Sequence, residues 1–261
     1  MASTMLQVPQ KFDIGRVFGN TFQVIRRNAG LWLALAALFS AVPTLIFQLL
    51  VLVPLGAAGP IDPNTLADHP EIVALNSGLG AIGGIISFVL SLLLQSALIR
   101  ATIEDLNGKQ PSMRDCLGTA VSVLLPVLGL AILVGLGVGL GLMLLIVPGI
   151  ILALRWSISV PVLVQERPGI TASMGRSAFL TNGSRWPLLG LFVIIIFASF
   201  GIQAALATVQ MALGLIAGAV IEAVVQGVLS MVMSTATAVS YVELRQVKEG
   251  TSVGELAEIF S

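Results

Sequence analysis

Charged residues are scarce in this chain of 261 residues, and their scarcity excludes a soluble globular domain. Only 10% of the residues are charged, while 56% are hydrophobic, and the mean hydropathy is +1.01. Soluble domains carry about 25% charged residues. The apolar runs are long and unbroken, which favours helices over the short alternating strands of a β-barrel. The fold class that follows is an all-α membrane protein.

Cysteine and histidine are each present once, as Cys116 and His69. A single cysteine excludes an internal disulfide framework, and we expect a free thiol in the cytoplasm. The histidine is expected on the other side of the membrane, so it cannot activate this thiol as a nucleophile. The zero net charge provides no basic field for nucleic acid. We therefore expect no enzyme, no cofactor and no nucleic-acid partner.

Six apolar runs have about the 20 residues that a membrane span requires. The first is too long for the apolar region of a signal peptide, so we expect a retained span with a kink at Pro43. Val147-Pro148-Gly149 is a turn signal between the third and fourth runs. The fourth is short, and a re-entrant segment is the alternative to a full span. The six runs are 31–55, 72–99, 121–147, 149–164, 187–211 and 213–241.

Basic residues are confined almost entirely to four polar segments. Twelve of the thirteen Lys and Arg residues lie in segments 1–30, 100–116, 165–186 and 242–261. By the positive-inside rule these segments are cytoplasmic, with both termini inside. The opposite loop contains acidic residues and His69 among three prolines, and we expect it to be solvated rather than to bind a metal. Its polar residues are Asp62, Asp68, His69 and Glu71.

A similar polar-apolar segment precedes each pair of spans. This repetition predicts three hairpin units, 12–110, 111–168 and 169–250, followed by a short cytoplasmic tail, 251–261. In the first and third segments apolar residues recur at helical spacing. We therefore expect a cytoplasmic interfacial amphipathic helix before each hairpin. The expected N-caps are Asp13, Ser112 and Thr171.

Arg155 and Glu222 are ionised side chains within predicted spans, where a charge costs about 2.5–3.5 kcal/mol. At about 1.5 Å per residue they lie at depths of roughly 10 and 15 Å from the outer face. We expect them to pair, with Gln95, Gln226 and Trp156 as neighbours. Such a pair could fix helix packing or form a polar site for protons or a substrate. The alternative is that Arg155 reaches an interface instead.

Basic residues at the cytoplasmic ends of the spans are expected to contact anionic lipid headgroups or to dock another protein. They are Arg16, Arg26, Arg27, Arg176, Arg185 and Lys248. Within the third span, glycines recur four residues apart, at 135 and 139 and at 137 and 141. This spacing favours close helix packing over a nucleotide-binding loop.

The order of several short motifs resembles a known family. The motifs are Val147–Ile151, Arg155-Trp156, Pro161–Glu166, Met174–Ser177, Leu180–Trp186, Tyr241–Arg245 and Lys248–Gly250. Over residues 12–250 the chain is similar to a bacterial family named after the membrane domain of glycerophosphoryl diester phosphodiesterase. The resemblance implies a six-span fold. It implies no phosphodiesterase activity, because in those enzymes the catalysis belongs to a separate soluble barrel.

Together these observations favour a non-catalytic inner-membrane protein. We expect a scaffold or accessory subunit whose partners are the lipid bilayer and another membrane protein or complex. The alternative is a small transporter or lipid-handling protein with a polar site at Arg155 and Glu222.

Overall fold

The computed structural model describes residues 11–57, 70–213 and 215–250. All regular structure in these ranges is helical, with no strand among them. The elements, in chain order, are α1 (Ile14–Arg27), α2 (Ala29–Ala36), the π-helical segment η1 (Ala37–Ala41), α3 (Val42–Ala57), α4 (Pro70–Leu106), α5 (Met113–Leu144), α6 (Ile146–Trp156), α7 (Ser159–Glu166), α8 (Ile170–Thr181), α9 (Arg185–Leu213) and α10 (Leu215–Glu249).

Six helical stretches of the described residues are long and apolar enough to cross a membrane, which indicates a multi-pass membrane protein. Each overlaps one of the six runs predicted from the sequence. They are Ala29–Leu50, Ser77–Leu106, Met113–Leu144, Ile146–Glu166, Arg185–Gln210 and Ala217–Glu249. The predicted tail and the acidic loop around His69 lie outside the described residues.

The predicted irregularity at Pro43 takes the form of a π-helical segment. Pro43 has no backbone N–H, and in an α-helix its ring would clash with the carbonyl of residue 39. The chain widens over η1, where the N–H of Val42 bonds the carbonyl of Ala37, five residues earlier. Such a π-turn relieves the clash and keeps the helix continuous.

The turn between α5 and α6 lies two residues earlier than the sequence predicts. Leu145 is the extended residue that separates the helices, with φ −161° and ψ 144°. Pro148 sits in the first turn of α6, where its missing N–H costs nothing. Gly149 permits close helix contact, because a Cβ there would lie 2.7 Å from the backbone nitrogen of Leu142. The prediction that the turn lies at Pro148-Gly149 was therefore wrong.

The fourth span is broken between α6 and α7. Pro161 lies in the first turn of α7, and a continuous helix would bring its ring against the carbonyl of Ser157. Hydroxyl groups satisfy the carbonyls that the break releases. Ser159 Oγ donates to the carbonyl of Trp156 at 2.7 Å, and Ser177 Oγ of α8 donates to that of Arg155 at 2.9 Å.

Two of the three segments expected to be interfacial helices form separate short helices, α1 and α8. Asp13 caps α1 as predicted, since its Oδ1 accepts the N–H of Arg16 at 2.7 Å. Ser112 is also an N-cap, but the helix that it opens is α5, which continues without interruption to Leu144. The prediction of a separate interfacial helix before the second hairpin was therefore wrong. Of the three expected N-caps, Thr171 was wrong, because α8 already begins at Ile170 after Gly169.

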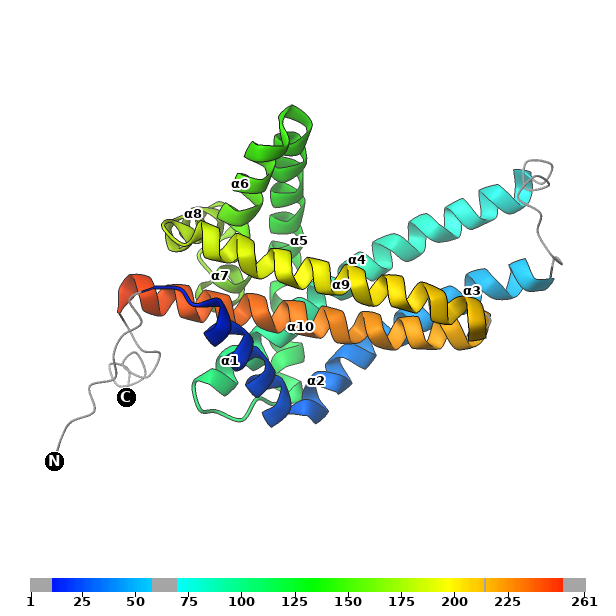
Figure 1. Cartoon of the computed structure of the whole chain (residues 1–261), viewed down its shortest axis with the longest axis horizontal. Helices are drawn as coiled ribbons and strands as arrows, with labels where there is room; N and C mark the ends of the chain where they lie inside the picture. Colours follow the sequence, from blue (N-terminus) through cyan, green and yellow to red (C-terminus); the bar gives the residue numbers. More distant parts are fainter. Residues whose placement is uncertain (1–10, 58–69, 214, 251–261) are drawn as a thin grey trace.

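Three helix pairs fan out from a common region near α1, α7 and α8 (Figure 1). The pairs are α3–α4, α5–α6 and α9–α10. Between the pairs, α4 packs on α5 and α10, and α10 also packs on η1 and α3. The short helix α1 packs on α10. The two core clusters lie near the common region, around Trp32 and Leu98 in one and Val127 and Val239 in the other.

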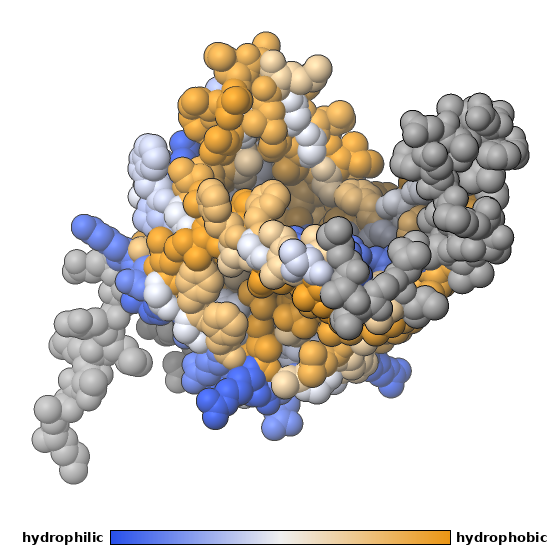
Figure 2. Space-filling view, turned by 45° about the vertical axis from the view of Figure 1, so that its right-hand side comes forward, coloured by the Kyte–Doolittle hydropathy of each residue, from blue (hydrophilic) through white to orange (hydrophobic). Residues whose placement is uncertain are grey.

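The far end of the α5–α6 pair carries exposed apolar side chains. Met143 and Leu144, at the tip of α5–α6, are 86% and 80% exposed. Figure 2 shows the hydrophobic tip of this pair above a lower and left-hand rim where hydrophilic residues gather. The apolar tip of α5–α6 and the hydrophilic rim are therefore at different ends of the molecule.

Candidate functional site

Glu222 lies on α10 and faces α9, not Arg155. Gln210 Nε2 of α9 donates to Glu222 Oε2 at 2.9 Å. Gly218 allows this approach, because a Cβ there would lie 2.9 Å from the Cγ of Gln210. A carboxylate in an apolar helix thus obtains an amide partner from the adjacent helix.

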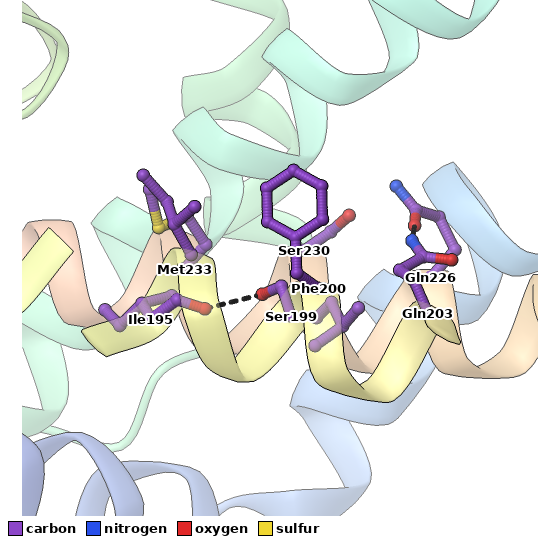
Figure 3. A pocket seen from close by; sticks show the side chains of 9 residues that line it. Ile195, Ser199, Phe200, Gln203, Gln226, Ser230 and Met233 are labelled. Atoms are coloured by element: carbon purple, nitrogen blue, oxygen red, sulfur yellow. Dashed lines mark hydrogen bonds between the residues drawn. The ribbon is translucent and has the colours of Figure 1, made fainter. Parts of the chain in front are cut away.

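Further polar residues continue this line along α9 and α10. Gln203 Nε2 donates to Gln226 Oε1 at 3.4 Å, and both side chains are exposed. They line a cavity of about 360 Å³ with Ser199 and Ser230, and these side chains project from one face of the pair (Figure 3). We name as the polar seam the set Ser199, Gln203, Gln210, Glu222, Gln226 and Ser230.

Arg155 does not pair with Glu222, whose carboxylate accepts from Gln210 instead. It ends α6, its side chain is exposed, and no ion pair joins it to Glu222 within the described parts of the chain. Its carbonyl accepts hydroxyl groups from α8, at the end of the span nearer to the charged residues. The predicted pair was therefore wrong, and the interface alternative for Arg155 fits its position better.

Gln95, Gln226 and Trp156, the predicted neighbours of the Arg155–Glu222 pair, do not lie together either. Gln226 belongs to the polar seam, whereas Gln95 lies on α4 with no recorded bond to Arg155 or Glu222. Trp156 packs on α5 instead, where a Cβ at Gly137 would lie 2.5 Å from its ring. Gly137 and Gly141 serve the predicted close packing, while Gly135 and Gly139 face open space.

The ionised residues gather at the opposite end in a set that we call the charged base. It contains ion pairs between helices from different predicted units. Its members are Arg16, Arg27, Arg100, Glu104, Asp105, Glu166, Arg176, Glu243, Arg245 and Glu249.

Arg176 of α8 joins α7 to α10 within the charged base. Its Nε lies 3.0 Å from Glu166 Oε2, and its Nη2 pairs with Glu249. The hydroxyl of Tyr241 donates to Glu166 Oε1 at 2.8 Å. Burial opposes the charge on Arg176, but hydrogen bonds to Glu166 and Glu249 outweigh it and raise the pKa of the guanidinium above its ordinary value.

Two further contacts attach α1 to the long helices. Arg16 Nε donates to Glu243 Oε1 of α10 at 2.6 Å, and the Glu243 side chain is only 3% exposed. At the other end of α1, Arg27 Nη2 lies 2.9 Å from Asp105 of α4. Asn28 Nδ2 donates to the same carboxylate at 2.6 Å. The short helix α1 thus connects the ends of α4 and α10.

The six basic residues predicted to contact headgroups divide into two groups. Arg16, Arg27 and Arg176 are engaged in the ion pairs described above. No ion pair is recorded for the other three among residues 11–57, 70–213 and 215–250; they are Arg26, Arg185 and Lys248.

Sequence reasoning missed Gln203 and Gln210 and the acidic partners of the charged base. The polar residues of the seam do carry a helical spacing, since Glu222, Gln226 and Ser230 are four residues apart and Gln203 and Gln210 are seven apart. One polar face on each of two consecutive apolar helices was the signal that could have predicted the seam.

No group of three or more potential metal ligands occurs in the described part of the chain. Comparison with models of protein families, with curated proteins and with solved structures finds no match for this chain. The resemblance to the phosphodiesterase membrane domain therefore stays a prediction from its motifs, and the site is described by its own geometry.

Proposed function

We propose that this chain is a non-catalytic protein of the bacterial inner membrane that acts as a scaffold or accessory subunit of a membrane complex. In this proposal the helix pairs α3–α4, α5–α6 and α9–α10 are three hairpin units. The charged base and both termini face the cytoplasm, which agrees with the positive-inside rule. The helices α1 and α8 then lie at the cytoplasmic interface.

The polar seam is the observation that supports a scaffold function. Gln203 and Gln226 are exposed within the apolar stretches Arg185–Gln210 and Ala217–Glu249. Lipid tails cannot hydrogen-bond these amides, whereas a membrane helix with its own polar side chains can. We therefore propose that a partner's polar membrane helix covers the seam.

The alternative function is a small transporter with a polar site at Arg155 and Glu222. These two residues do not lie in one site. Arg155 lies at the end of α6 beside α8, while Glu222 bonds Gln210 on the far pair of helices. The broken span α6–α7 is a feature that transporters also use, but its freed carbonyls are already satisfied by hydroxyl groups.

Affinity purification in a mild detergent tests the proposed scaffold. We expect a partner at near-equal stoichiometry with the wild-type chain, because the seam requires a polar helix against it. The double change Gln203→Leu and Gln226→Leu should remove most of this partner. The matched control is Thr208→Val, which also removes an exposed polar group from α9, one that bonds only its own helix.

Two outcomes would contradict this function. One is a wild-type chain that purifies without any protein in near-equal amount. The other is equal recovery of the partner with the seam variant and with Thr208→Val, which would place the contact elsewhere.

A further inference from the structure

Arg185 belongs to none of the ion pairs of the charged base. It opens α9, and its Nε is buried with no hydrogen-bond partner. A buried guanidinium N–H without an acceptor is costly, so native structures supply one. Within the described residues no carboxylate takes this role for Arg185, whereas Arg16, Arg27 and Arg176 each have one.

An apolar cavity lies beside Arg185, between α6 and α9. Its volume is about 410 Å³, which falls within the usual range of ligand sites. One wall is a single face of α6, formed by Val147, Ile150, Ile151 and Leu154. These residues follow the helical spacing of three and four, so they form a continuous apolar strip.

The wall on α9 supplies the polar end of the same cavity. Arg185, Trp186 and Leu189 line it, and the Trp186 side chain is 83% exposed. Arg185 and Trp186 open α9, and their two N–H groups have no partner within the helix. Pro187 has no N–H, and the N–H of Leu188 donates to the carbonyl of Ser184 at 3.1 Å. An anion beside this first turn would be favoured by both the guanidinium and the N–H groups of Arg185 and Trp186.

A second cation lies close to the same turn. A Cβ added at Gly183 would be 3.9 Å from the Nζ of Lys248. This ammonium group also lies 5.8 Å from the ring centre of Phe179, and no ion pair is recorded for it in the described part of the chain. Positive charge is therefore present at the α8–α9 turn, and the apolar strip extends from there toward the tip of α6.

We infer that this cavity binds one anionic membrane phospholipid. The phosphate lies against Arg185 at the first turn of α9, and one acyl chain lies along the strip from Leu154 to Val147. Trp186 is suited to the headgroup region, where amphipathic aromatic rings accumulate. The inference does not rest on the proposed partner at the polar seam, because the two cavities share no lining residue.

Native mass spectrometry of the detergent-purified full chain tests this site with phosphatidylglycerol and phosphatidylcholine as probes. We expect the wild-type chain to retain one phosphatidylglycerol in preference to phosphatidylcholine. Arg185→Gln should weaken retention about tenfold or more, which is the effect of losing charge-assisted hydrogen bonds. Arg114→Gln is the matched control, because Arg114 is exposed at the start of α5 and lines no part of this cavity.

A second variant, Ile150→Trp, fills the apolar strip without changing charge, and it should also abolish retention while thermal unfolding shows a folded protein. The inference is overturned by equal loss in Arg185→Gln and Arg114→Gln, by equal retention of phosphatidylcholine, or by unchanged retention in Ile150→Trp. Displacement of the lipid by inorganic phosphate alone would also overturn it, because the site would then be one for free anions.

Discussion

The buried Glu243 carboxylate pairs with Arg16, and no sequence pattern indicated this ion pair. Glu243 is buried on α10, and the Arg16 guanidinium from α1 is the cation that pairs with it. The sequence predicted Arg16 as a basic residue that contacts lipid headgroups or docks another protein. It could not predict Glu243 as the partner, because the two residues are 227 positions apart and only the packing of α1 on α10 brings them together.

Replacing Arg16 with Met should destabilise the fold by about 1–3 kcal/mol, because a buried carboxylate would lose its partner. Arg26→Met on the same helix is the control, since Arg26 is exposed, and it should change stability by less than about 0.5 kcal/mol. Thermal unfolding in detergent measures both. Equal shifts in the two variants would show that the Arg16–Glu243 pair contributes nothing.

The α5–α6 pair shows what glycines contribute to an element. The sequence predicted close packing from regular glycine spacing, and the structure separates glycines that touch the neighbouring helix from those that do not. Gly149 contacts the backbone of α5, whereas nothing lies within 4 Å of a Cβ placed at Gly139. Spacing alone could not distinguish them, because both lie on apolar helices with no polar face to set their orientation.

Gly149→Ala should therefore separate α5 from α6 and cost about 1–3 kcal/mol, since backbone cannot yield to the added methyl group. Gly139→Ala should be neutral or slightly stabilising, because alanine favours the helix. The difference between their unfolding midpoints in the same detergent is the measurement. A Gly149→Ala protein as stable as Gly139→Ala would mean that the close contact has no structural role.

At the scale of the whole molecule, the six stretches long enough to span a membrane were predictable from the sequence. Their packing was less predictable. Hydropathy located six spans because each must be about 20 apolar residues long. It could not pair Arg155 correctly, because residue counting gives depth along one helix and no direction toward another. The break at Pro161 and the widening at Pro43 follow from proline chemistry, yet their form depends on the neighbouring helices.

The fan of helix pairs in Figure 1 has a consequence for the molecule in a bilayer. Membrane helices tilt by about 20° on average, so the three pairs would lie closer to parallel there. Contacts between pairs include those of α4 with α5 and α10, and the tip of α5–α6 is exposed at Met143 and Leu144. We therefore expect the base to keep its ion pairs while the tips approach one another.

The central claim is that the charged base lies on the cytoplasmic face and the helix-pair tips on the other. Cysteine labelling of spheroplasts tests it most directly, in a chain whose own thiol is removed by Cys116→Ala. Gln110→Cys and Thr171→Cys probe exposed positions near the base, and Leu144→Cys probes an exposed tip.

An impermeant maleimide should label Leu144→Cys in intact spheroplasts. It should label Gln110→Cys and Thr171→Cys only after the membrane is made permeable. Labelling of either base position in intact spheroplasts, with Leu144→Cys protected, would contradict the account.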